Sequence, residues 1–322
     1  MATIGFHASH EQISPKQLLA DVQHAERAGF ESAMCSDHFA PWSARQGESG
    51  HPWPWLGAAL ATTSLTFGIV NAPGQRYHPA LIAQASATLA QMFPGRFWAA
   101  LGTGEFLNEH ITGERWPAKE QRSERLLECV DIIRRLHAGE RFTHEGHVKV
   151  HDAQLYTLPD PAPALIGAAT SVETAQWCAE WADGLVTVGI EPDDVAEVRS
   201  AYLDAGGAGP VTLQLHLSYA ASEDKALAIA HDQWRSNVFS SALTWDLWTV
   251  EQFDEAARFV KPEDLHGAVR ISADLDQHAQ WIREYADVGF DQIMLHHVGQ
   301  QQGGFIDDFG AHVLPQVKAD AR

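Results

Sequence analysis

Short apolar runs alternate with longer amphipathic segments along the 322 residues of this chain, and this alternation limits its fold more than any other feature. The apolar runs are residues 4–6, 32–35, 65–70, 97–101, 165–167, 184–188, 211–217 and 292–295. Strands that are each followed by a helix lie parallel in one sheet, with the helices packed on its faces. Eight such strands predict one domain over residues 1–322, a (β/α)8 TIM barrel.

The segments between these runs have the ends of helices. Ser14-Pro15 offers a capping hydroxyl and a proline in the first turn, and Gly29 ends the same segment. Further helices are expected at 79–92, 118–136, 171–181 and after Pro192. Residues 222–266 form a helical insertion before the last strand, and 268–271 is a candidate extra strand. The alternative is an open doubly wound sheet, but no Gly-x-Gly-x-x-Gly follows the first strand.

Composition excludes some partners. The chain has 22 Lys and Arg against 42 Asp and Glu, a formal net charge of −20, which disfavours nucleic acid and anionic membranes as partners. Three cysteines are too few for a disulfide framework. The N-terminus lacks the pattern of a signal peptide, and no apolar run approaches the roughly 18 residues of a membrane span. We therefore expect a soluble, cytoplasmic protein.

Histidine and tryptophan are both abundant, with 18 and 11 residues. Trp53 and Trp55 alternate with prolines, and this spacing predicts a fixed, semi-buried loop after the second strand. Together with Trp42, these indoles could line a planar cofactor or a sugar, or they could only fill the loop.

The residues just after the strands are the candidates for an active site, because a (β/α)8 barrel has its active site at the carboxyl ends of its strands. Asp37-His38 is the sharpest element, since histidine is the usual general base for a hydroxyl proton; the alternative is a solvent-facing pair in a loop. Glu105 follows Gly102-Thr103-Gly104, whose glycines let the backbone approach a flat ligand, or only make a tight turn.

Residues 168–171, Ala-Ala-Thr-Ser, open a helix. Free amides and two hydroxyls at a helix start suit a phosphate, although an ordinary serine cap explains the same residues. A metal-dependent hydrolase is a second class of function, because His7, His10, His296 and His297 lie at the ends of the first and last strands. A third class is a non-enzymatic barrel that binds its ligand without catalysis.

Several spaced motifs resemble those of the luciferase-like flavin-dependent oxidoreductases. These are GFHASHEQ at 5–12, SDHFAPW at 36–42, RYHPA at 76–80, and GTGE at 102–105 followed by Asn108-Glu109. The branch that the chain resembles includes the deazaflavin-dependent glucose-6-phosphate dehydrogenases. The resemblance extends over nearly the whole chain and implies a barrel with one insertion, a homodimer, and FMN or the deazaflavin coenzyme F420 bound at the strand ends.

The resemblance also implies roles for individual residues. The catalytic residues are His38 as the base, Trp42 beside the reacting centre, Glu105 as the facing acid and Glu11 as a further carboxylate. The implied cofactor-binding residues are Asp37, Val70, Asn71, Gly102, Thr103, Gly104, Asn108, Ala168, Ala169, Thr170 and Ser171. The Val70–Asn71 bond falls where the family often has a non-proline cis peptide. The substrate-pocket residues are His7, Trp53, Thr187 and His296, and no metal is expected.

The departures from the family concern the substrate. The stretch after the sixth strand, Thr187-Val188-Gly189-Ile190-Glu191, has an apolar residue where the sugar-phosphate branch has a lysine, and Gly267-Ala268 and Gly303-Gly304 stand where that branch has basic pairs. Without cationic partners a phosphate is not retained well, so we expect an uncharged polyol, sugar or aromatic substrate rather than glucose 6-phosphate. The acidic chain disfavours the polyanionic tail of coenzyme F420, which leads us to predict FMN, with an F420-dependent dehydrogenase or a flavin monooxygenase as alternatives.

Overall fold

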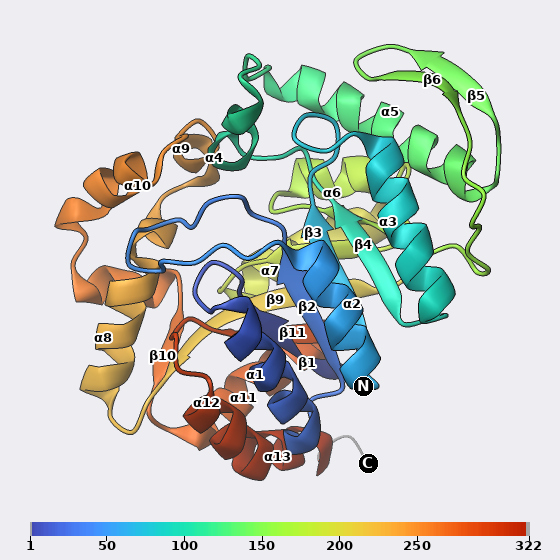
Figure 1. The fold of residues 1–322 in the computed structure, drawn as a ribbon. Helices are drawn as coiled ribbons and strands as arrows, with labels where there is room; N and C mark the ends of the chain where they lie inside the picture. The colour runs from blue at the N-terminus through green and yellow to red at the C-terminus, as the bar shows by residue number, and fades with distance from the viewer. Residues whose placement is uncertain (1, 320–322) are drawn as a thin grey trace.

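The computed structural model describes residues 2–319, in which eight parallel strands close into a central barrel (Figure 1). In ring order the strands are β9 (Val211–Tyr219), β11 (Gln292–His297), β1 (Thr3–Ala8), β2 (Ser32–Ser36), β3 (Thr66–Asn71), β4 (Phe97–Leu101), β7 (Leu165–Ala168) and β8 (Leu185–Val188). Pairing of β8 with β9 closes the ring. The predicted (β/α)8 barrel is confirmed.

Helices surround the barrel on the outside (Figure 1). They are α1 (Pro15–Ala28), α2 (Pro52–Thr62), α3 (Pro79–Met92), α5 (Lys119–His137), α6 (Val172–Cys178), α7 (Pro192–Asp204), α11 (Leu275–Val288), α12 (Gly303–Asp308) and α13 (Leu314–Ala319). Short α4 (Phe106–Glu109) follows β4. Gly29 ends α1 with φ of 101°, as the sequence predicted. Within the described residues, no helix is long and apolar enough to cross a membrane.

The segment between β9 and β11 carries the extra elements. It holds α8 (Glu223–Trp234), α9 (Ser241–Thr244) and α10 (Val250–Ala256), with 3-10 turns between and after them. The candidate extra strand is present as β10 (Arg270–Ser272), which pairs in parallel with the end of β9, Arg270 opposite Leu217. In Figure 1, α8 and α10 lie to one side of the barrel.

Two parts of the chain differ from the sequence-based expectation. The Pro-Trp-Pro-Trp segment is the first turn of helix α2 and not a loop, because Pro52 occupies a first-turn position where no amide donor is required. The segment between α5 and β7, for which the sequence predicted no strand, contains a hairpin of β5 (Phe142–Glu145) and β6 (Lys149–Ala153).

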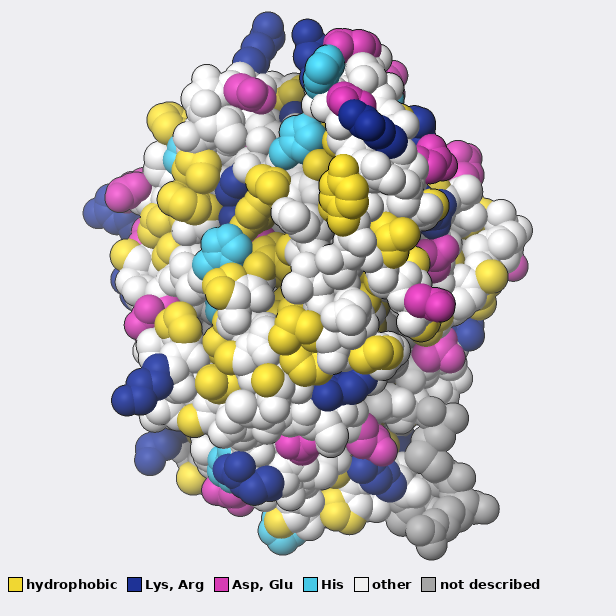
Figure 2. Space-filling view, turned by 45° about the vertical axis from the view of Figure 1, so that its right-hand side comes forward, with side chains coloured by type: hydrophobic (Ala, Val, Ile, Leu, Met, Phe, Trp, Pro, Cys, Tyr) yellow, Lys and Arg dark blue, Asp and Glu magenta, His cyan; other side chains and the backbone are white. Residues whose placement is uncertain are grey.

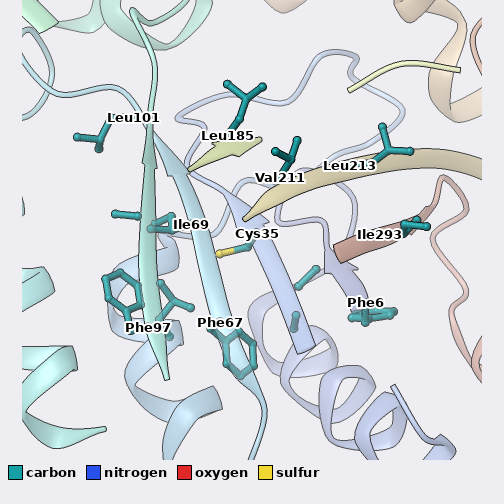
Figure 3. Close-up of a cluster of buried hydrophobic side chains, with 14 of the residues drawn as sticks. Phe6, Cys35, Phe67, Ile69, Phe97, Leu101, Leu185, Val211, Leu213 and Ile293 are labelled. Carbon is teal, nitrogen blue, oxygen red and sulfur yellow. The ribbon is translucent and has the colours of Figure 1, made fainter. Parts of the chain in front are cut away.

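The strands pack on both faces. Their outward side chains, such as Phe67, Ile69 and Leu213, contact the helices (Figure 3). Inside the barrel, Met34, Ala100, Ile166, Val186 and Met294 form a separate apolar cluster. Trp98 packs against this cluster, and a Cβ on Gly68 would lie 2.1 Å from its indole, so only glycine fits there. This apolar cluster, together with Trp98, fills the barrel interior below the polar residues at the carboxyl ends of the strands.

Candidate active site

A cavity of about 660 Å³ lies at the carboxyl ends of the barrel strands. Most of the residues predicted for the site line it: His7, Glu11, Asp37, His38, Trp42, Val70, Asn71, Gly102, Thr103, Gly104, Glu105, Asn108, Ala168, Ala169, Thr170, Thr187 and His296. Trp53 and Ser171 do not. The barrel topology brings these residues together, since parallel strands end on the same face.

His38 and Glu11 form a close pair at one side of the cavity. Glu11 Oε1 lies 2.7 Å from His38 Nδ1, and Ser9 Oγ donates a 2.9 Å hydrogen bond to the other carboxylate oxygen. Burial alone lowers the pKa of His38, but the carboxylates of Glu11 and Glu105 outweigh it, so this pKa is raised above 6.5. Burial would raise the pKa of Glu11, but the attraction of His38 brings it down to about 2.

Glu105 faces the other nitrogen of the same imidazole. Its Oε2 is 3.9 Å from His38 Nε2, and Asn108 Nδ2 donates to that oxygen at 3.2 Å. Burial raises the pKa of Glu105 above its ordinary value. The Asn108 Oδ1 atom accepts from Phe39 N at 2.8 Å, which fixes the loop after β2 to the short helix α4. Trp42 stands edge-on to His38, with 5.3 Å between ring centroids.

Asp37 is buried and accepts hydrogen bonds from several neighbours. Trp53 Nε1 and Asn71 Nδ2 donate to its Oδ2 at 2.9 and 2.8 Å, and Arg76 pairs with its Oδ1 at 3.2 Å. Trp53 therefore lies behind the site, because its N–H turns towards Asp37; this corrects its placement in the substrate pocket. Asn71 lines the cavity. Its side-chain oxygen, Oδ1, is buried and has no hydrogen-bond partner among the described residues.

Small residues make a wall of the cavity at β3, β4 and β7. Val70, Gly102, Gly104 and Ala168 line it, and a Cβ on Gly102 would meet only Ala168 Cβ, at 3.7 Å. Such a low wall fits a flat ring system, since nothing projects from it. The Val70–Asn71 peptide is trans, contrary to expectation; Asp160–Pro161 is the cis bond found in the described chain. Both Val70 and Asn71 continue the regular pairing of β3 with β4.

Ser171 has the role of a helix cap. Its Oγ accepts from Thr174 N at 3.3 Å and donates to Thr174 Oγ1 at 2.9 Å. This hydroxyl is turned into helix α6 rather than into the cavity, whereas the neighbouring Thr170 does line the cavity. The structure thus shows Ser171 as the cap of α6 and outside the cavity lining, and its contact with a cofactor phosphate stays a prediction.

Opposite the low wall lies a group of rings that we call the imidazole nest: His7 from β1, His216 from β9, His296 from β11 and Trp234 from helix α8. His7 and His296 are stacked with 4.3 Å between centroids, and Trp234 meets His296 edge-on at 4.6 Å. Burial lowers the pKa of His7 to about 4 and that of His216 to about 3. The nest is therefore uncharged at neutral pH.

Two of the nest residues and the nearby Gln214 were missed from the sequence. Gln214 and His216 could have been found from a period-two alternation in β9, where Thr212, Gln214, His216 and Ser218 interrupt an apolar run. Residues two apart on a strand share a face, and here that face is turned to the barrel interior. Trp234, at the end of α8, carries no signal in its neighbouring sequence.

The ionisable residues that line the cavity are mostly acidic. Lys119 is the cation that lines it within the described chain, and it lies 3.8 Å from Glu173. The carboxylates that line it are Glu11, Asp37, Glu105, Glu109, Glu120 and Glu173. On the face seen in Figure 2, the Lys and Arg side chains of the described residues are scattered and form no single patch.

The hydrolase alternative required a cluster of metal ligands. No group of three or more His, Cys, Asp and Glu side chains arranged to hold a metal is found from residue 2 to residue 319. The stacked geometry of His7 and His296 is instead that of a ring–ring contact.

Comparison with known proteins supplies independent findings. Residues 1–292 match the family model described as luciferase-like monooxygenase. An F420-dependent glucose-6-phosphate dehydrogenase of Microbacterium testaceum is 34% identical over 98% of this chain and 97% of its own length. An F420-dependent hydroxymycolic acid dehydrogenase of Mycobacterium tuberculosis is 33% identical over 98% of this chain and 88% of its own. Among solved structures, an F420-dependent secondary alcohol dehydrogenase in complex with an F420–acetone adduct superposes with a TM-score of 0.90 and 28% identity, covering 98% of this chain and 99% of the other.

Proposed function

The chain belongs to the luciferase-like monooxygenase family and is a flavin- or deazaflavin-dependent oxidoreductase, and from this premise we propose that it is a coenzyme F420-dependent dehydrogenase. Its reaction interconverts an uncharged secondary alcohol and the corresponding ketone. The FMN prediction is not confirmed, because the relatives at 28–34% identity are named for coenzyme F420. This supports the deazaflavin alternative.

The observation that carries the proposal is the His38–Glu11 pair. A carboxylate 2.7 Å from Nδ1 favours the proton of neutral His38 on that nitrogen, which leaves Nε2 bare. That Nε2 belongs to a residue that lines the cavity. It takes the hydroxyl proton when the alcohol is oxidised, and in its protonated form returns a proton to the ketone oxygen in the reverse direction.

The low wall suits the deazaflavin ring. Coenzyme F420, when bound, supplies the acceptor or donor of the hydride that leaves or joins the substrate carbon. Asn71 fits such a ring, because Asp37 fixes its amide with the nitrogen turned away and leaves Oδ1 free as an acceptor for an N–H group. Val70, Gly102, Gly104 and Ala168 leave room for a flat face.

Local charge supports a substrate without phosphate. A phosphate dianion is held by Arg or Lys, and among the described residues of the lining the one such side chain is Lys119, which is paired with Glu173. Glu105 and Glu109 would repel such an anion. An alcohol without charge avoids that repulsion, and Trp42 and Trp234 give it apolar surface.

The test compares cofactors and then substrates. Purified protein is titrated with coenzyme F420 and with FMN, and we expect F420 to bind at least about tenfold more tightly, or roughly 1.4 kcal/mol. Turnover of simple secondary alcohols is followed by the loss of F420 fluorescence, and glucose is compared with glucose 6-phosphate. Tighter binding of FMN would refute the proposal, and so would a preference for the phosphorylated sugar. Oxygen uptake with the reduced cofactor would support the monooxygenase alternative instead.

A further inference from the structure

The imidazole nest has no part in the proposed proton and hydride steps, yet all four of its residues line the cavity. We propose that His7, His216, His296 and Trp234 bind a second, uncharged oxygen of the substrate, a hydroxyl or a carbonyl away from the reacting carbon. The inference rests on the proposed function and narrows its substrate class to polyols and hydroxyketones.

The strands and helix α8 hold the rings of the nest in fixed positions. His7, His216 and His296 lie near the carboxyl ends of three neighbouring strands, and the pairing of β9 with β11 places His216 directly opposite His296. All three imidazoles are nine-tenths or more buried. Trp234 closes the group from α8, with 4.9 Å between its ring and that of His216. Groups so fixed present the same polar atoms to every ligand.

His7 leaves a polar atom without a partner. Its Nδ1 is buried and makes no hydrogen bond to any described residue, although His7 lines the cavity. Its stacking on His296 fixes the plane of the ring. A buried polar atom without a partner costs about 1–3 kcal/mol, so a ligand oxygen that pairs with it gains affinity.

Around His296, the hydrogen bonds determine which ring nitrogen carries the proton. Gln12 Nε2 donates to Val298 O, which leaves Gln12 Oε1 as the acceptor for His296 Nε2 at 3.0 Å. Burial, with the neighbouring imidazoles, lowers the pKa of His296 well below 6.5, so the ring is neutral. Its Nδ1 is therefore bare, and it accepts from Gln214 Nε2 at 3.2 Å.

Counting the hydrogen-bond donors and acceptors at His216 in the same way leaves one N–H donor without an acceptor. Gln214 Nε2 also lies 3.2 Å from His216 Nε2, and Trp234 Nε1 lies 3.3 Å from His216 Nδ1. A neutral imidazole has one bare nitrogen, but two N–H groups are directed at this one. One of these donors therefore needs an acceptor, and the ligand in the cavity can supply it. An oxygen without charge fits, because among the described residues that line the cavity the one Lys or Arg is Lys119, which is paired with Glu173.

The experiment compares substrates that differ by one hydroxyl. Cyclohexanol is measured against cyclohexane-1,2-, 1,3- and 1,4-diol with the F420-loaded enzyme, and kcat/KM is determined for each. We expect at least one diol to exceed cyclohexanol by about tenfold, the size of one hydrogen bond to a buried group. His7→Phe and Trp234→Phe keep a ring in place and remove the nitrogens, so each should lower this ratio by about tenfold.

A matched control is available in His10→Phe. His10 is a second buried imidazole with both nitrogens unpartnered in the described residues, but it packs edge-on against Trp55 outside the cavity lining. This variant should keep the diol preference, which separates loss of the nest from a general effect of losing a buried histidine. Thermal unfolding and F420 binding confirm that each variant is folded and loaded.

The outcomes separate the two proposals. If cyclohexanol is oxidised but no diol is preferred, or if His7→Phe and Trp234→Phe keep the preference, the inference about the nest is overturned and the proposed function stands. If no alcohol is oxidised, the proposed function fails. The nest is then tested by calorimetry of the diols and cyclohexanol with the protein, where tighter binding of a diol supports it and equal binding refutes it.

Discussion

At the scale of single residues, the site depends on which nitrogen of His38 faces the cavity. Glu11 Oε1 lies 2.7 Å from Nδ1, so Nε2 is the nitrogen that we propose takes the substrate proton. Replacing His38 by Asn removes the base while keeping a polar side chain, and we expect kcat for alcohol oxidation to fall by roughly 100-fold or more. The dissociation constant of F420, measured by fluorescence titration, should change little. Normal turnover in this variant would exclude His38 as the base.

The pH dependence of the reaction rate should be set by the His38–Glu11 pair. Oxidation needs neutral His38, so its rate rises with pH through the pKa of His38, whereas ketone reduction needs the protonated form and declines there. Because the Glu11 carboxylate raises this pKa, Glu11→Gln should move both limbs to lower pH. Glu105→Gln should move them in the same direction by less, since Glu105 stands at 3.9 Å. Rate profiles measured in both directions check this, and an unmoved limb in Glu11→Gln would contradict it.

At the scale of elements, helix α2 supports the loop that carries the base. Trp53 donates to the buried carboxylate of Asp37, and Trp55, from the same helix, donates to the carbonyl of Pro15. A hydrogen bond to a charged group contributes more than a neutral one, about 1.5–3 against 0.5–1.5 kcal/mol. Trp53→Phe should therefore lower the free energy of unfolding more than Trp55→Phe. Denaturant titration of the two variants measures the difference, and equal losses would show that Asp37 does not depend on this bond.

The elements also show where sequence patterns suffice and where they fail. The strands and the helices starting at Pro15, Pro79 and Pro192 were predicted because each has its own apolar period and a proline or glycine at an end. Helix α2 was missed because alternating prolines usually mark a loop. The strand-end motifs, including His38 and Glu105, line the cavity because barrel topology fixes where strand ends meet. Trp234 could not be predicted, since only the packing of α8 brings it there.

At the scale of the whole molecule, net charge carries little information about the cofactor. The charge of −20 is spread over the chain, while a cofactor responds to the groups near its own site, and salt screens distant surface charges over about 10 Å. Counting acids and bases thus favoured FMN, whereas the relatives are named for F420. The total charge still acts on the approach of an anionic ligand, which gives the last prediction.

The cavity and the molecule are both acidic, so they repel the polyanionic tail of coenzyme F420 as it binds. Added salt screens this repulsion, and we expect the dissociation constant of F420 to fall by about two- to threefold between roughly 20 and 200 mM NaCl. The deazaflavin without phosphate and glutamate tail is the control, and its affinity should stay nearly constant. Fluorescence titration measures both. If salt weakens F420 binding instead, local attraction governs the tail, and Lys119→Met, which removes the cation in the cavity lining, should then abolish that salt dependence.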